Sequence, residues 1–351
     1  MNTLRKFSGM VLLTGIVVGV LGGLLVKLGN PPNMGICVAC FLRDTAGALG
    51  LHRASVVQYI RPEIIGFVLG AFLVSLLKGE FRSQGGSSTV IRFSLGAFLM
   101  IGALMFLGCP IRMLLRLGGG DLNALPGLAG FISGIWIGVL FLKRGFVLSR
   151  ATSLSKANGL IMPTFMFGLL ILLLVRPGFI FFSSKGSASQ HAPILISFIA
   201  GLIIGGLAQR ARFCFVAGVR DIILIKNPHL LIGFVAVLLF ATITNLTLGQ
   251  FHLGFLNQPV AHNDYIWNYL GMLLVGLAAT LLGGCPLRQL ILAGEGNSDS
   301  AITVLGMLIG SAFCHNFFLA SGVEGVTLNG KIAVTLGILF CFITGLGNRE
   351  V

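Results

Sequence analysis

The sequence predicts an all-α polytopic membrane protein with about ten transmembrane helices and four half-helices in two inverted-topology repeats. Three observations lead to this prediction: 56% of the 351 residues are hydrophobic, only 10% are charged, and two cysteine motifs each occur twice in the same order. A bilayer core requires runs of about 20 apolar residues, whereas a soluble domain of this size requires a polar surface. The 50 glycines also favour helices that approach closely or break, as in many transporters.

Ten apolar runs follow one another along the chain, and we interpret each as a membrane span. They lie near 8–28, 61–78, 91–108, 124–143, 160–176, 193–209, 229–248, 266–284, 300–320 and 330–347. The first run follows "MNTLRK", but it is too long for the core of a signal peptide and lacks a small-residue cleavage site, so we expect a retained helix.

An even number of crossings places both termini on one face of the membrane. Cytoplasmic termini put 15 of the 24 Lys and Arg residues inside and 9 outside, as the positive-inside rule favours. The expected localisation is therefore the cell inner (plasma) membrane, as a multi-pass protein.

Four shorter amphipathic segments lie between these runs, near 38–51, 110–118, 215–226 and 286–293. Each is too short to cross a bilayer and follows a Gly-rich or Cys-containing break. Non-helical backbone at membrane depth is tolerated where protein or water lines it. We therefore expect half-helices that enter the membrane and stop there.

Cysteines mark an internal duplication. The segment "LGCPIRMLLRLGGGD" (107–121) matches "LGGCPLRQLILAGEGNSD" (282–299), and "CVACFLRD" (37–44) matches "CFVAGVRD" (214–221). Cys37 precedes Cys109 by 72 residues, and Cys214 precedes Cys285 by 71. Five crossings separate equivalent positions, and an odd number inverts the second half relative to the first.

The duplication divides the chain into four parts. We expect a first repeat over 1–150, a linking helix and loops over 151–190, a second repeat over 191–325 and a C-terminal helix over 326–351.

Each Cys-Pro motif predicts a thiol at the start of a helix. Because Pro suits the first helical position, Cys109 and Cys285 are expected N-caps. The unpaired N–H groups and the positive dipole end at such a position attract an anion and favour a thiolate. Arg112 and Arg288, at helical spacing from the thiols, add positive charge. We therefore expect an anion pathway near the midplane, where all four joints meet, formed by Cys37, Cys40, Cys109, Arg112, Cys214, Cys285 and Arg288.

Other polar and thiol residues have open or structural interpretations. Cys40 forms a Cys-x-x-Cys with Cys37, which is compatible with redox or metal chemistry. It has no counterpart in the second half, so packing and function both stay open for it. A zinc site is disfavoured because no second close Cys/His pair exists, and we expect no metal or other cofactor. Cys314 and Cys341 are expected to be small core residues.

The acidic residues near the motifs are expected to have structural or gating roles. Arg43 with Asp44, and Arg220 with Asp221, form two expected ion pairs that hold or gate the half-helices. Asp121 and Asp299 are expected to cap the helices that follow them.

These motifs and the Gly-rich apolar background resemble the YeeE/YedE sulphur-transport family over about residues 10–345. The segment "GNPPNMGICVACFLRDTAGALGLHRASVVQYIRPE" (29–63) is similar more specifically to the YedE branch of selenium transporters. The resemblance implies an hourglass-shaped carrier that moves thiosulfate inward, with cysteines passing the ion along through transient S–H contacts. The implied stations are Cys109 and Cys285, with Cys37 or Cys40 and Cys214 as further candidates. This chain departs from the thiosulfate carriers in having five such cysteines where they use three.

The function that follows is a permease, not an enzyme, for a small selenium- or sulphur-containing anion. Its expected partners are this anion, the lipid bilayer and a small cytoplasmic sulphur or selenium carrier protein. A nucleic-acid partner is excluded because no polar domain presents a basic face.

Two alternatives stay open. A soft-metal carrier, for example for Cu(I), suits thiolates but not the arginines and helix N-termini beside them. A membrane sulphurtransferase with a persulfidated cysteine lacks a general base that recurs near the motifs. No nucleotide-binding motif occurs, and both passive flow and proton coupling are compatible with the sequence.

Overall fold

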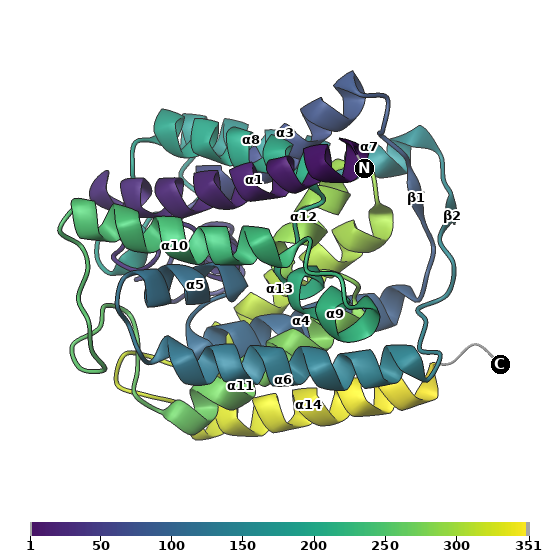
Figure 1. The fold of residues 1–351 in the computed structure, drawn as a ribbon. Helices are drawn as coiled ribbons and strands as arrows, with labels where there is room; N and C mark the ends of the chain where they lie inside the picture. Colours follow the sequence, from purple (N-terminus) through teal and green to yellow (C-terminus); the bar gives the residue numbers. More distant parts are fainter. Residues whose placement is uncertain (1, 349–351) are drawn as a thin grey trace.

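The computed structural model describes residues 2–348, and of residues 2–8 only the backbone. The first residue and the last three, which belong to the expected first and last parts of the chain, lie outside this description. Fourteen α-helices make up nearly all regular structure in the described part (Figure 1). Ten of them are long: α1 (Asn2–Lys27), α3 (Pro62–Leu77), α4 (Thr89–Phe106), α6 (Ala124–Lys143), α7 (Lys156–Val175), α8 (Ile194–Ala211), α10 (Leu231–Thr247), α11 (Tyr265–Leu281), α13 (Ser298–Asn316) and α14 (Leu328–Gly347).

The other four helices are the expected half-helices. They are α2 (Val38–Ala48), α5 (Pro110–Gly118), α9 (Phe215–Ile225) and α12 (Pro286–Gly294). A two-residue ribbon of β1 (Gln84–Gly85) and β2 (Thr152–Ser153) and a short 3-10 helix, η1 (Ser187–Ser189), complete the regular structure of residues 2–348.

The protein is an all-α polytopic membrane protein, as the sequence predicts. By length and composition, the described residues contain seven candidate membrane spans, three of which join a long helix to the half-helix after it. Two shorter apolar helices, α3 and α10, are the next candidates, and α13 completes the ten predicted runs. The breaks inside the joined spans have local causes. Gly283 ends α11 at φ +80°, where a side chain would be strained, and Pro110 and Pro286 then start the half-helices.

Close helix crossings at glycines hold the bundle together. Gly130, Gly134 and Gly138 of α6 face Tyr269, Leu273 and Thr280 of α11 in increasing order, so these helices run parallel. A Cβ atom at Gly134 would lie 2.1 Å from the carbonyl oxygen of Leu273. Small residues let the backbones approach this closely. The resulting van der Waals packing holds helices together in lipid, where the hydrophobic effect does not drive their association.

The helix packing repeats itself between the two halves of the chain. As α6 packs on α11, α13 packs on α4, and as α3 packs on α8, α10 packs on α1. The half-helices follow the same rule, because α5 packs on α10 as α12 packs on α3, and α9 packs on α6 as α2 packs on α13. In each of these comparisons, one contact becomes the other when α1–α7 are exchanged for α8–α14 in the same order. The main departures from this rule are α7 and α14, since α7 packs on α3 and α12 whereas α14 packs on α4 and α11.

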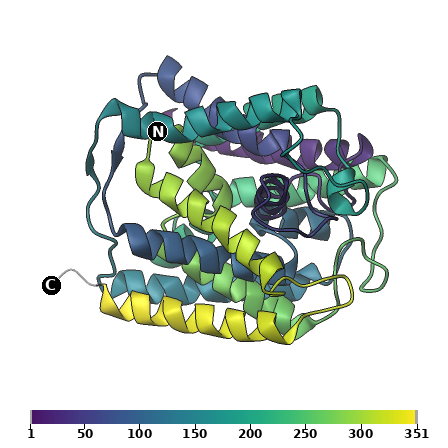
Figure 2. The same ribbon diagram turned by 180° about the vertical axis from the view of Figure 1, so that it is seen from behind.

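The half-helices lie inside the bundle. In Figure 1, α1, α3 and α8 lie along one edge and α6, α11 and α14 along the other, with α5 and α9 between them. The opposite view in Figure 2 confirms that α14 runs along one edge, while α13 crosses obliquely at the front of this view. Both views place the start of α1 and the end of α14 on the side that carries β1 and β2, as an even number of crossings requires.

The expectation that Asp121 and Asp299 cap helices was wrong. The N-cap residues of α6 and α13 are Asn123 and Asn297. Asp121 accepts a hydrogen bond from Arg116 at 2.6 Å, and its other oxygen accepts one from the backbone N–H of Asn123, just before α6, at 3.0 Å. Asp299 accepts one from the backbone of Gly86 at 2.9 Å and so ties α13 to the β1 loop. Both carboxylates thus have several partners besides the start of a helix, as a buried carboxylate requires.

Candidate functional site

The first cysteine group lies where α2 and α5 begin. Cys37 is the N-cap of α2, and its thiol accepts a hydrogen bond from the backbone N–H of Cys40 at 3.2 Å. Cys109 is the N-cap of α5, as the following proline predicts, and its thiol is a direct neighbour of that of Cys37. Cys37 and Cys40 are fully buried, and Cys109 is 1% exposed. Two helix N-termini thus point at one cluster of thiols, an arrangement that favours negative charge.

Arg112 joins this group. Its Nη1 lies 3.3 Å from the thiol of Cys40 and also bonds the carbonyl of Leu107. Its Nε donates to the carbonyl of Asn33 at 3.0 Å, and its Nη2 donates to that of Val260 at 3.0 Å. No carboxylate pairs with this fully buried guanidinium among the residues the structure describes. Its positive charge is balanced only by neutral acceptors and a thiol, which suits it to an anion.

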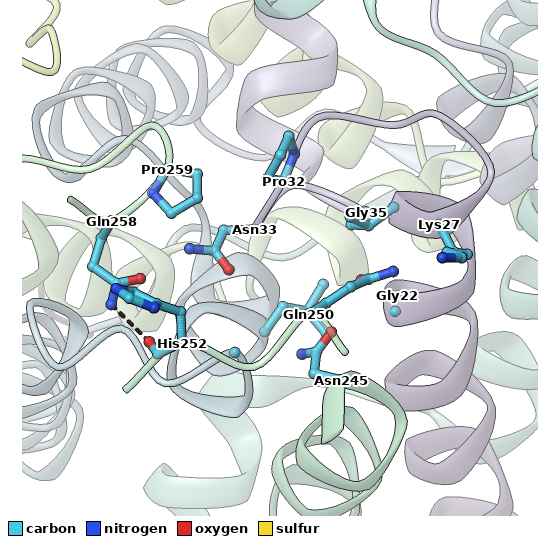
Figure 3. Close-up of a pocket in the computed structure, with 14 residues that line it drawn as sticks. Gly22, Lys27, Pro32, Asn33, Gly35, Asn245, Gln250, His252, Gln258 and Pro259 are labelled. Atoms are coloured by element: carbon cyan, nitrogen blue, oxygen red, sulfur yellow. Dashed lines mark hydrogen bonds between the residues drawn. The ribbon is translucent and has the colours of Figure 1, made fainter. Parts of the chain in front are cut away.

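A cavity of about 310 Å³ adjoins the group on the side away from the termini. Polar side chains from the loop after α1, the end of α10 and the loop before α11 converge on it (Figure 3). They are Lys27, Asn33, Asn245, Gln250, His252 and Gln258. Asn33 lines this cavity, and so does Pro259, the residue before Val260. The Arg112 guanidinium, which bonds the carbonyls of Asn33 and Val260, therefore lies between the cavity and the thiols.

The second cysteine group contains Cys214 and Cys285, the N-caps of α9 and α12. The backbone N–H of Cys285 lies 3.4 Å from the thiol of Cys214. Two neighbouring thiols at two helix starts thus occur here as they do for Cys37 and Cys109. The first group also contains Cys40, which has no counterpart among the described residues of the second group. The four motif cysteines form two pairs, and no hydrogen bond joins the pairs in the described part of the chain. That all four meet near the midplane stays a prediction.

Arg288 differs from its counterpart Arg112. Its Nη1 pairs with Glu295 at the end of α12 at 3.1 Å, so the guanidinium extends away from Cys285. The sequence analysis missed Glu295, which stands where the first half has Gly119. Among the described residues, the first thiol group therefore has an arginine without a carboxylate partner, Arg112, whereas the arginine of the second group, Arg288, is paired with Glu295.

The expected ion pairs form, with different surroundings. Arg43 bonds Asp44 at 2.7 Å, and Arg61 bonds the other oxygen of Asp44 at 2.8 Å. All three side chains are buried. Arg220 bonds Asp221 at 2.8 Å, but 19% of the Asp221 side chain is exposed. Sequence reasoning missed Arg61, although an Arg-Pro-Glu sequence directly before an apolar run was a usable signal.

Cys314 and Cys341 are fully buried in α13 and α14, in keeping with their expected role as packing residues.

Comparisons with known proteins agree with the motifs. Residues 210–346 match the family described as "Sulphur transport". The chain is 31% identical over 122 residues to the "Thiosulfate transporter TsuA" of Escherichia coli (strain K12), which covers 34% of this chain and 33% of that protein. It is also 31% identical over 103 residues to the protein of the same name from Spirochaeta thermophila, covering 29% of each chain.

The aligned segments thus span about a third of the curated relatives, and the family match lies in the second half, which carries Cys214 and Cys285. The same Cys-Pro-x-Arg and Cys…Arg-Asp pattern recurs in the first half. These findings make the chain similar to the sulphur-transport family that its motifs resemble.

Proposed function

We propose that this protein is a permease for a small sulphur- or selenium-containing anion, such as thiosulfate, in the cell inner membrane. The observation that carries the proposal is the placement of four buried thiols at the N-termini of four half-helices. A soft anion finds backbone N–H donors, dipole ends and polarisable sulphur there without a fixed carboxylate beside it. The relatives' printed names, both thiosulfate transporters, support a sulphur anion. The selenium assignment rests on the resemblance of residues 29–63 alone.

The proposed route begins in the cavity of Figure 3 and passes Arg112 to reach Cys37, Cys40 and Cys109. It continues through Cys214 and Cys285 toward the side of the termini, where Arg288 pairs with Glu295. Arg112 draws the anion out of the cavity because it has only neutral partners. The two pairs of thiols are successive stations for the anion.

We also propose that the halves form an inverted-topology repeat. The packing exchange between α1–α7 and α8–α14 supports a duplicated fold. An odd number of spans between equivalent helices supports the inversion. In this arrangement the two thiol pairs are reached from opposite faces, which gives the route its two mouths. A small cytoplasmic sulphur or selenium carrier protein is the proposed recipient at the inner mouth.

The alternatives have less support. A Cu(I) ion bound at the Cys40 thiol would be repelled by the Arg112 guanidinium, whose Nη1 lies 3.3 Å from that thiol. The described residues contain no group of three or more His, Cys, Asp or Glu side chains that could hold a metal ion. A sulphurtransferase is an enzyme, whereas the relatives are named transporters.

Uptake into proteoliposomes tests the proposal. Radiolabelled thiosulfate and selenite are each supplied outside vesicles that contain the wild type, Cys109→Ala, Cys285→Ala or the control Cys341→Ala. We expect each of the first two variants to lose at least about tenfold in uptake, the loss that follows from removing about 1.4 kcal/mol of favourable interaction. Cys341→Ala should transport normally because this thiol lies in α14, outside both groups. Full uptake by the double variant Cys109→Ala, Cys285→Ala would refute the thiol pathway.

A further inference from the structure

A buried carboxyl group without a cation is joined through Asn30 to the loop that lines the cavity. Glu63, in the first turn of α3, is 1% exposed. Its Oε1 accepts a hydrogen bond from Asn30 at 2.8 Å, whereas its Oε2 has no partner. Among the described residues, no arginine, lysine or histidine lies within ion-pair distance of it. An ionised carboxylate buried in this way is costly unless a proton or another partner reaches it.

The open oxygen of Glu63 has a second unsatisfied group in its surroundings. Tyr59 is 2% exposed, its hydroxyl has no partner, and it interacts electrostatically with Glu63. The Tyr59 ring stacks on that of His191 with centroids 4.3 Å apart and an interplanar angle of 5°. Because His191 is only partly buried, this stack leads from the surface toward the carboxyl group.

The other charged groups of this neighbourhood have partners of their own. Arg61 bonds Asp44 at 2.8 Å and the carbonyl of Gln190 at 3.1 Å. Arg176 lies over the ring of Phe182 and is exposed at the end of α7. Tyr59 from the same segment and His191 from the loop before α8 interact with Glu63. The charged groups that in turn interact with Tyr59 and His191 are Arg61 and Arg176. None of them neutralises Glu63 by contact.

A short chain of contacts connects Glu63 to the thiols. The Asn30 amide that bonds Glu63 also donates to the carbonyl of Gly35 at 2.9 Å. Residues 30–37 form the loop that ends at Cys37, and the loop carries the Asn33 carbonyl that accepts from Arg112. Pro32, Asn33 and Gly35 of the same loop line the cavity. A change of charge at Glu63 therefore acts on the wall of the cavity and on the anchor of Arg112.

We propose that Glu63 binds a proton together with the transported anion, so that anion uptake is proton-linked. This inference rests on the permease proposed above and supplies its energy coupling. An anion that enters a cell alone moves against the inside-negative potential, and a proton carried with it reduces that opposition. In this proposal the proton binds at Oε2 of Glu63 and leaves the protein with the anion, so no other atom changes its bonding.

The test measures protons and anions in the same proteoliposomes. Vesicles with a trapped pH-sensitive dye receive radiolabelled thiosulfate, with and without an outside-acid gradient of one pH unit. For the wild type, we expect thiosulfate addition to acidify the lumen and the gradient to drive up to about tenfold accumulation for each coupled proton. Glu63→Gln retains an oxygen for Asn30 and should transport thiosulfate down its own gradient with no response to pH. Glu80→Gln, which alters an exposed carboxylate paired with Arg210 just beyond the other end of α3, should behave as the wild type.

The outcomes separate the two proposals. Thiosulfate uptake without lumen acidification in the wild type overturns the role of Glu63 and leaves the permease intact, even if Glu63→Gln fails to fold. Accumulation driven by pH in Glu63→Gln also overturns it. A wild type that carries neither thiosulfate nor selenite refutes the permease, and the proton link falls with it.

Discussion

At the scale of single residues, the two copies of the Arg-Asp motif differ in burial and therefore in importance for stability. Asp44 balances two buried guanidinium groups, those of Arg43 and Arg61, whereas Asp221 pairs with one partly exposed arginine. Breaking a buried pair leaves an uncompensated charge, while exposed pairs contribute little.

Asp44→Asn is therefore expected to lower the free energy of unfolding by about 3–5 kcal/mol. The matched change Asp221→Asn should cost about 0–1 kcal/mol. Thermal unfolding of both variants in detergent checks this difference. Equal destabilisation would show that burial of Asp44 does not govern its contribution.

Histidines in the loops predict a loss of stability in acid. Burial lowers the pKa of His52, His191 and His262 below the ordinary value of 6.5. At His262, Nε2 lies 2.8 Å from the carbonyl of Met105, and Nδ1 accepts from the backbone N–H of Asp264. Protonation of Nδ1 would remove this hydrogen bond, because the new N–H of His262 would face the backbone N–H of Asp264.

The sign follows from proton binding. Because the folded pKa of each histidine is lowered, the unfolded chain binds more protons between that pKa and 6.5. Stability contributed by the neutral histidines is complete above 6.5 and falls as pH decreases through that range. We expect the melting temperature to fall between pH 7 and 5, and to fall less steeply in His262→Gln. A melting temperature that stays constant over this range in the wild type would contradict the prediction.

At the scale of elements, glycines determine how closely the helices pack. Gly134 of α6 faces the backbone of α11, whereas Gly168 of α7 has open space around its Cα. Gly134→Leu would force the backbones apart, since a rigid carbonyl cannot yield as a flexible side chain can.

We expect Gly134→Leu to abolish or severely reduce the yield of monodisperse protein, and Gly168→Leu to leave it unchanged. Size-exclusion chromatography in detergent measures both. Normal behaviour of Gly134→Leu would mean that the α6–α11 contact is not a close crossing in the membrane.

At the scale of the whole molecule, the ten long helices place the start of α1 and the end of α14 on one side (Figure 1). The positive-inside rule predicts that this side faces the cytoplasm. This prediction places the cavity of Figure 3, with Lys27 and the neutral amides around it, on the outer side.

Reporter fusions at the C-terminus test this orientation. A fluorescent protein that matures only in the cytoplasm should be bright there, and a phosphatase active only outside should be silent. A fusion in the 176–193 loop, on the opposite side, should give the reverse result. Active phosphatase at the C-terminus would invert the proposed direction of uptake.

Local sequence determined the elements and the places where the thiols sit. Apolar length set the ten long helices, because hydrocarbon thickness sets how many residues a span needs. Proline at the first position placed Cys109 and Cys285 at helix starts. These features depend only on neighbouring residues, so the sequence analysis predicted their bounds to within a few residues.

Only the tertiary structure decided which of these parts meet. It separated the thiols into two pairs, placed Arg112 beside Cys40, turned Arg288 toward Glu295 and left Glu63 without a cation. Each of these outcomes depends on side-chain direction or on contacts between segments far apart in the chain. Spacing along a sequence does not encode such contacts, because in the bilayer the packing of whole helices brings these groups together.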